Sequence, residues 1–166
     1  MTDTTQPTAP EDERPGPRRL TDEALSELLG AHQFGVLATN KRSGHPHLTT
    51  MVYAWDPEAR VVRFSTTADR VKLRHLRKDA RAALHVSSDD RWSFAVAEGS
   101  AEVSDTAAAP DDAVARELLA MLPPPARPGN REDEAAFLAA QVAEERVVLR
   151  LRVDHLYGTV LDMPAE

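Results

Sequence analysis

Cysteine and isoleucine are both absent from this chain of 166 residues, and lysine occurs at only three positions. The absence of cysteine excludes disulfides, thiolate zinc sites, iron–sulfur clusters and cysteine nucleophiles. Scarce isoleucine and lysine, beside abundant alanine, arginine and proline, are typical of a GC-rich genome. We take this composition to favour an actinobacterial source.

Long apolar runs are also missing. No segment approaches the roughly 18–20 consecutive apolar residues that span a bilayer. The N-terminus lacks the apolar core of a signal peptide. We therefore expect a cytoplasmic protein without a membrane partner.

Length and charge suit a single folded domain. The hydrophobic fraction of 42% is enough for a core, and the charged fraction is 28%. The net charge of −7 argues against a general nucleic-acid binder, which needs excess positive charge to neutralise phosphates.

The N-terminal segment differs in composition from the rest. Residues 1–18 are rich in proline, threonine and charge and lack apolar periodicity. This predicts a disordered tail and leaves residues 19–163 for a single domain. A helix is expected to begin after the N-cap Thr21 and to end near Gly30, with an apolar face made by Ala24, Leu25, Leu28 and Leu29.

The remaining chain alternates short strand-like segments with turns. Strands are expected over residues 34–39, 47–55, 61–66, 82–86, 92–103, 147–153 and 155–160. Helices are expected over residues 70–78, with Asp69 as the cap, and over 110–122 and 132–144. Gly99, inside a long strand, predicts a bulge.

The order of these elements predicts the fold class. Most strands follow one another through short turns, which favours a mainly β, small antiparallel barrel with peripheral helices. No glycine-rich phosphate loop follows a strand, which excludes Rossmann and P-loop folds.

Positive charge is concentrated in one stretch. Residues 60–81 hold eight basic and two acidic side chains, a net charge of +6 in an acidic protein. Within it, the hydroxyls of Ser65 and Thr66 precede Arg70 and Lys72 at the start of the expected helix. Hydroxyls, cations and free helix N–H groups together predict a phosphate cradle. The alternative is a solvated basic helix with acidic neighbours.

Several short motifs, in order, carry a family resemblance. They are Gly35-Val36-Leu37-Ala38-Thr39, Gly44-His45-Pro46-His47-Leu48, Asp56-Pro57, Ser65 through Arg70-Val71-Lys72 to Leu76-Arg77-Lys78-Asp79, Trp92-Ser93-Phe94-Ala95-Val96-Ala97-Glu98-Gly99, and Arg146-Val147-Val148 to His155-Leu156-Tyr157-Gly158. Over about residues 21–158, the chain resembles the pyridoxamine 5′-phosphate oxidase-like split-barrel flavoproteins. Within them it is most similar to the actinobacterial class that uses the deazaflavin coenzyme F420.

The resemblance implies an FMN-binding split β-barrel of antiparallel Greek-key type and a set of cofactor contacts. The strand after the Gly-x-Pro turn is expected to run beneath the flavin ring of the cofactor. The phosphate and tail of the cofactor are expected to contact the strand end and helix start that follow. These contacts fall on Thr49, Thr50, Met51, Val52, Ser65, Thr66, Arg70 and Lys72.

The remaining expected contacts concern the tail and a second subunit. Where the family often has asparagine after the lysine, this chain has His75. Trp92 and Phe94 match positions that reach the cofactor of the other subunit, so the resemblance implies a homodimer with its sites at the interface.

The implied activity is that of an F420-dependent oxidoreductase that transfers a hydride to an electron-poor small molecule. An F420 tail carries a phosphodiester and several carboxylates, so it needs cations over an extended path, which Arg70, Lys72, Arg74 and His75 could supply. FMN needs only a compact phosphate cup. Two alternatives remain, an FMN-dependent oxidase of pyridoxine-type phosphates and a non-catalytic F420 carrier. A protein that binds no cofactor, or that binds a tetrapyrrole-type ligand, is a less favoured alternative.

Catalytic residues are not evident from the sequence. Tyr53 and His47 are candidates for a proton donor, but strand alternation can point either one away from the substrate. His45 and His47 form a His-x-His pair without an evident third ligand, so we expect no metal site.

Overall fold

The computed structural model describes residues 16–161 and contains one antiparallel sheet with four α-helices. The strands are β1 (Pro17–Arg19), β2 (Phe34–Asn40), β3 (Pro46–Val52), β4 (Ala54–Asp56), β5 (Val61–Thr67), β6 (Arg81–Ser87), β7 (Ser93–Val103) and β8 (Arg146–Leu161). The helices are α1 (Asp22–Ala31), α2 (Val71–Lys78), α3 (Ala113–Ala120) and α4 (Arg131–Ala143), with a short 3₁₀ turn at Pro124–Ala126.

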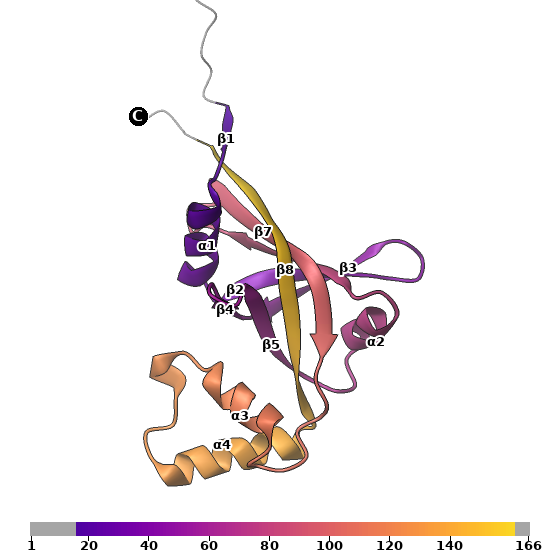
Figure 1. Ribbon diagram of the computed structural model, residues 1–166, viewed down its shortest axis with the longest axis vertical. Helices are drawn as coiled ribbons and strands as arrows, with labels where there is room; N and C mark the ends of the chain where they lie inside the picture. Colours follow the sequence, from indigo (N-terminus) through magenta and orange to yellow (C-terminus); the bar gives the residue numbers. More distant parts are fainter. Residues whose placement is uncertain (1–15, 162–166) are drawn as a thin grey trace, which may run out of the picture.

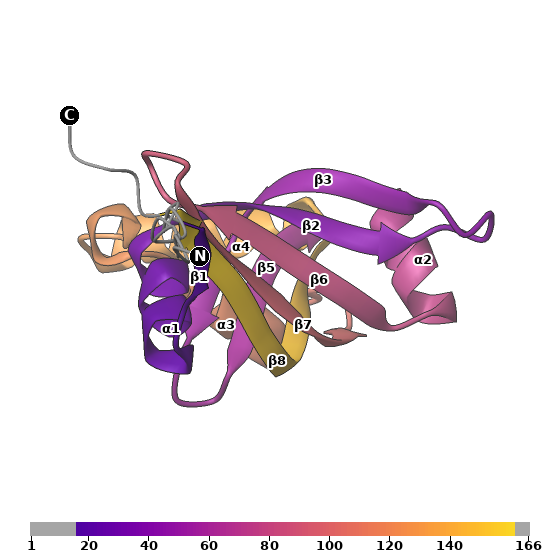
Figure 2. The same ribbon diagram turned by 90° about the horizontal axis from the view of Figure 1, so that it is seen from above.

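The sheet curls into a half-barrel. Its strand order is β3-β2-β6-β7-β8-β5-β4, and β1 pairs with β8. The long strands β7 and β8 cross the molecule, while α1 and α2 lie at opposite sides of the sheet (Figures 1 and 2). Phe64, Leu84, Leu149 and Leu151 are fully buried in the core. The expected mainly β split barrel with peripheral helices is confirmed.

Gly99 marks the expected bulge between β7 and β8. The register shifts between Glu98 and Gly99, which pair with His155 and Val153 respectively, so Asp154 has no opposite residue. A Cβ at Gly99 would lie 1.8 Å from the Arg152 carbonyl oxygen, so only glycine allows this approach. The sequence predicted two strands, 147–153 and 155–160, and that division was wrong because the bulge is absorbed within the continuous strand β8.

The expected single strand over residues 47–55 is also corrected. It divides at Tyr53 into β3, which pairs with β2, and β4, which pairs with β5. At the break, the Tyr53 backbone N–H donates to the Gln33 carbonyl (2.9 Å), and its hydroxyl donates to the Leu29 carbonyl (2.6 Å). The two bonds hold Tyr53 at the point where the chain leaves β3, at one end of the strand order, and enters β4, at the other end.

Three of the four helices between residues 16 and 161 begin after a side-chain N-cap, and Thr21 is the one of these caps that the sequence predicted. Thr21, Asp112 and Asn130 cap α1, α3 and α4 by accepting a backbone N–H three residues on. Asp69 does not cap α2. Its carboxylate instead accepts the Thr67 hydroxyl at 2.6 Å, and Arg70 is the N-cap without a side-chain cap bond.

Helices α3 and α4 form a helical lobe, residues 113–143, below the sheet in Figure 1. Leu118 of α3 and Leu138 of α4 pack with Val148 of β8 in a second apolar cluster. Glu117 of α3 accepts hydrogen bonds from Arg63 (2.9 Å) and Arg150 (2.8 Å) of the sheet. Both apolar contacts and ion pairs therefore fix the lobe to the outer face of β5 and β8.

The N-terminal boundary differs from the expectation. Pro17 and Arg18, which the sequence assigned to the tail, pair with Leu161 and Val160 of β8. Residues 1–15 of the expected tail lie outside the described residues, as do residues 162 and 163 of the expected domain. No helix between residues 16 and 161 is long and apolar enough to cross a membrane.

Candidate cofactor and substrate site

A cavity of about 1650 Å³ lies where the sheet fails to close. Its walls come from β3, β4 and β5, the start of α2, the end of α1 and the helical lobe. Eight residues expected to contact a cofactor line it, namely Thr49, Thr50, Met51, Val52, Ser65, Thr66, Arg70 and Lys72. The structure thus brings together residues from three separate segments of the sequence.

One wall of the cavity is an unpaired strand edge. Strand β3 is last in the sheet order, and among residues 16–161 it pairs only with β2. In an antiparallel ladder, every second residue of an end strand turns its backbone N–H and C=O away from its partner. Because Thr49–Val52 line the cavity, this edge can offer backbone donors and acceptors to a ligand.

The opposite part of the cavity is cationic. Lys72 is only 6% exposed, yet its ammonium has no hydrogen bond or ion pair with any residue between 16 and 161. Burial, together with the nearby Arg70 guanidinium, lowers the pKa of Lys72 and outweighs the attraction of Asp69. Among residues 16–161 no fully buried polar side-chain atom lacks a hydrogen-bond partner, so the unpaired Lys72 ammonium keeps accessible surface at the cavity that Lys72 lines. A partly dehydrated cation without a partner is unfavourable, so its presence at a cavity indicates a site for an anion.

Hydroxyl groups and a further arginine surround this cation. Thr66 is 5% exposed and Ser65 is half-buried. Arg146 of β8 donates to the Ser65 hydroxyl (3.4 Å) and to Glu144 (2.8 Å). Sequence reasoning missed Arg146 as a lining residue, although it stands in one of the motifs that carry the resemblance.

His75 lies away from this cavity. Its Nδ1 is 3.2 Å from the Thr39 hydroxyl, and its ring meets that of His47 edge-on, with centroids 5.2 Å apart. Burial and neighbouring positive charges lower the pKa of His75. It lines a second cavity, of about 770 Å³, between α2 and the β2–β3 hairpin.

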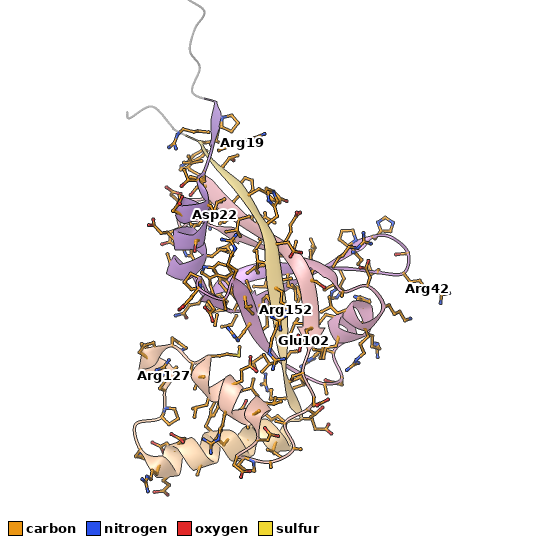
Figure 3. All side chains as sticks on the ribbon, in the orientation of Figure 1. Arg19, Asp22, Arg42, Glu102, Arg127 and Arg152 are labelled. Carbon is orange, nitrogen blue, oxygen red and sulfur yellow. The ribbon has the colours of Figure 1, made fainter. Side chains whose placement is uncertain are left out.

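This second cavity is strongly basic. The side chains of Lys41, Arg42, Arg74, Arg77 and Lys78 line it. None of the five forms an ion pair with a residue of the described chain, and Figure 3 shows Arg42 at the tip of the hairpin. Asp79, the acidic residue in its lining, is held by Asn40 (2.9 Å) and Arg81 (2.8 Å).

Trp92 and Phe94 do not line the cavity of their own chain. Trp92 is 46% exposed, and the Phe94 ring stacks on His85 with centroids 5.4 Å apart. Both residues lie near the start of β7. The outward face of the sheet in this region also carries the exposed side chains of Phe34 and Leu48.

Of the two candidate proton donors, Tyr53 is engaged and His47 does not line the large cavity. Tyr53 is 5% exposed, burial raises its pKa, and its hydroxyl hydrogen is directed to the Leu29 carbonyl. The His47 Nδ1 is 3.3 Å from the Thr49 hydroxyl. The site therefore contains binding groups for a charged ligand without an evident catalytic acid among the described residues.

Comparisons with known proteins agree with this architecture. A profile of the family described as pyridoxamine 5′-phosphate oxidase matches residues 21–159. A conserved hypothetical protein from Mycobacterium tuberculosis is 21% identical, with a TM-score of 0.71, over 89% of this chain and 91% of that chain. A structure titled F420 reductase is 23% identical, with a TM-score of 0.57, over 79% and 94%.

A protein from Mesorhizobium loti described as FAD-binding is 20% identical, with a TM-score of 0.59, over 86% of this chain and 96% of that chain. At these identities the solved structures show the fold alone. The match to the family profile covers most of the chain, and its half-barrel is the one that this family shares. The chain belongs to the pyridoxamine 5′-phosphate oxidase-like split-barrel family.

Proposed function

We propose that the protein is an F420-dependent oxidoreductase that reduces an electron-poor small molecule. The observation that carries the proposal is Lys72, a largely buried side chain whose ammonium has no partner among residues 16–161 and lines a cavity that an unpaired strand edge also lines. A phosphate-bearing ligand with an amide-containing ring would satisfy both. The neighbour titled F420 reductase supports the deazaflavin, and the FAD-binding neighbour supports the wider flavin class.

The residues present fit such a coenzyme. The backbone of Thr49–Val52 would bind the polar edge of the ring, and the Ser65 and Thr66 hydroxyls with Arg70 and Lys72 would bind the phosphodiester. The second cavity holds cations beyond those that one phosphate needs, with Arg74 and His75 nearest in sequence to Lys72. This excess favours a carboxylate-rich tail, and so F420 over FMN.

The protein's contribution is to bind and orient, because the bound coenzyme supplies the hydride. An enone substrate would gain a hydride at its β carbon and a solvent-derived proton at its α carbon, and the two electrons leave the reduced coenzyme. Backbone N–H groups of the β3 edge would stabilise negative charge on the ring. The cavity walls would exclude water from the reacting atoms.

We also propose that the active form is a homodimer. Phe34, Leu48 and Val52 are 64%, 62% and 56% exposed. Phe34 pairs with Val52 across β2 and β3, so both point to the same outward face. On that face Tyr157 of β8 is 43% exposed and stands opposite the buried Val96, so exposed apolar surface is also present on β8. A second copy of this chain would cover it and bring Trp92 and Phe94 towards the partner's cavity.

Turnover of the reduced coenzyme tests the proposal. Oxidation of reduced F420 should be followed with a panel of enones and quinones, after titration of the protein with F420 and FMN separately. We expect F420 to bind more tightly than FMN and at least one acceptor to be reduced. Tight F420 binding without turnover on any acceptor would instead indicate a carrier. Bound FMN, with absorption bands at about 370 and 450 nm, would indicate a flavin oxidase.

A further inference from the structure

The large cavity has a second half that the coenzyme contacts do not use. The helical lobe and strand β4 line it with apolar side chains. Trp55 faces it from β4, and Met121, Leu122, Pro123 and Phe137 face it from the lobe. These five residues, which we call the apolar half, are each half-buried, so they retain surface that a ligand could cover.

The charged side chains near the apolar half already have partners. Arg63 donates to Asp56 (3.1 Å) and to Glu117 (2.9 Å). Glu144, which follows α4, accepts from Arg146 at 2.8 Å, and the Arg146 guanidinium also reaches Ser65 of the coenzyme half. A charged ligand that paired with one of these groups would have to displace its present partner. The displaced partner would then lose its hydrogen bond.

The polar groups of the lobe itself are also engaged. The Arg127 Nε, on the lobe in Figure 3, donates to the Leu122 carbonyl at 2.9 Å. The Gln141 side chain is 8% exposed and donates to the Phe137 carbonyl at 3.0 Å. The contrast is that Lys72 in the coenzyme half has no partner among residues 16–161, whereas Arg63 is paired with two carboxylates and Arg127 donates to a backbone carbonyl.

We infer that the apolar half binds the body of the substrate, and that this substrate is an uncharged, hydrophobic molecule with a conjugated double bond. Burial of apolar surface is then the main source of substrate affinity, and Leu122 and Met121 of the lobe set the acceptable length. The inference rests on the proposed function for the identity of the reaction, but substrate binding itself needs no coenzyme.

A homologous series tests the inference without turnover. The probes are pent-3-en-2-one, hept-3-en-2-one and non-3-en-2-one, together with a nine-carbon enone that ends in a carboxylate. The chain has no cysteine that these enones could alkylate. Trp55 lines the apolar half, so quenching of tryptophan fluorescence reports binding.

We expect Kd to fall about fourfold for each added CH₂ until the cavity is filled. The carboxylate-ended enone should bind more weakly than its neutral counterpart. Leu122→Asp should abolish the dependence on chain length, whereas the matched control Ala139→Asp should leave it unchanged, because Ala139 is exposed on α4 and does not line the cavity.

A Kd that is independent of chain length, or tighter binding of the carboxylate, would overturn the inference. Equal effects of Leu122→Asp and Ala139→Asp would also overturn it. Failure of the proposed function is distinguishable, because F420 would then fail to bind or to turn over while the chain-length dependence of enone binding persists.

Discussion

Lys72 shows how a single side chain can reveal a binding site. Its side chain is largely buried and its ammonium has no partner among residues 16–161, so the charge loses part of its hydration without a compensating contact, which lowers the stability of the unliganded protein. Such a residue persists in a fold when a ligand needs it.

We therefore predict that Lys72→Met leaves the unliganded protein equally stable or more stable by about 1 kcal/mol. Methionine keeps most of the apolar stem and removes the charge. Urea denaturation without coenzyme measures the difference. A loss of more than about 1 kcal/mol would mean that Lys72 has a structural role, contrary to the site assignment.

Glu117 joins the helical lobe to the sheet, and its contribution depends on pH. Hydrogen bonds from Arg150, and then from Arg63, lower the pKa of the Glu117 carboxyl below its ordinary value of 4.5. A lowered pKa in the folded state means that the stabilisation is complete above about pH 4.5 and is lost as the pH falls through the folded-state pKa.

We expect Glu117→Gln to lower the free energy of unfolding by about 1–2 kcal/mol at pH 7. The gap between wild type and variant should narrow below about pH 4.5, as the wild-type carboxyl becomes protonated. Denaturant curves at pH 7 and pH 3.5 measure this. A gap that is constant with pH would show that packing, and not charge, holds the lobe.

At the residue scale, the sequence predicted the cationic cluster but not the ion pairs around it. Ser65, Arg70 and Lys72 are close in the chain, so a strand end followed by a helix start predicts their convergence. Glu117, in contrast, lies 54 residues from Arg63 and 33 from Arg150. No local pattern could predict that pairing, because it depends on how the lobe packs against β5 and β8.

At the element scale, two glycines with opposite surroundings give a matched comparison. A Cβ at Gly99 would collide with the Arg152 backbone, whereas the nearest atom to a Cβ at Gly30 of α1 is 3.9 Å away, in the Trp55 ring. Alanine is the better residue within a helix, and it clashes at the bulge.

Gly30→Ala should raise the free energy of unfolding by about 0.5–1 kcal/mol. Gly99→Ala should lower it by more than about 2 kcal/mol, because backbone atoms must shift to admit the methyl group. Guanidinium denaturation of each variant and of the wild type measures both changes in the free energy of unfolding. Equal tolerance of the two substitutions would contradict the register assigned to β7 and β8.

The sequence predicted an element boundary where a particular residue type marks it. It did not predict a boundary that arises because consecutive strand segments pair with different strands. Thr21 and the position of Gly99 gave a helix start and a bulge correctly. The break at Tyr53 was missed, because the residues on both sides favour a strand and only the change of partner from β2 to β5 divides them. Asp69 was misassigned as a cap because its carboxylate has a closer local partner in Thr67.

At the scale of the whole molecule, the outward apolar face on β2 and β3 leads to a prediction about assembly. An obligate interface between two copies should bury more than about 2,000 Å². The double substitution Phe34→Asp with Leu48→Asp places charge where the face must be desolvated, and both side chains are exposed in the single chain.

We expect the wild type to be a dimer and the double variant a folded monomer at micromolar concentration. Light scattering gives the mass, and circular dichroism confirms that the variant is folded. Arg116→Asp, on the exposed surface of α3, is the control and should remain dimeric. A monomeric wild type would refute the shared site that we propose for Trp92 and Phe94.

The most direct test of the central claim is the affinity of F420 for Lys72→Met at low and high salt. A charge-assisted hydrogen bond contributes about 1.5–3 kcal/mol, so binding should weaken by roughly 10- to 100-fold. The wild-type affinity should also fall as salt screens the attraction. Arg74→Met, with a coenzyme that lacks the glutamates, is the control and should bind like wild type, because Arg74 lines the second cavity. If Lys72→Met binds F420 as tightly as wild type at low salt, the buried cation does not hold the coenzyme, and the proposed site is contradicted.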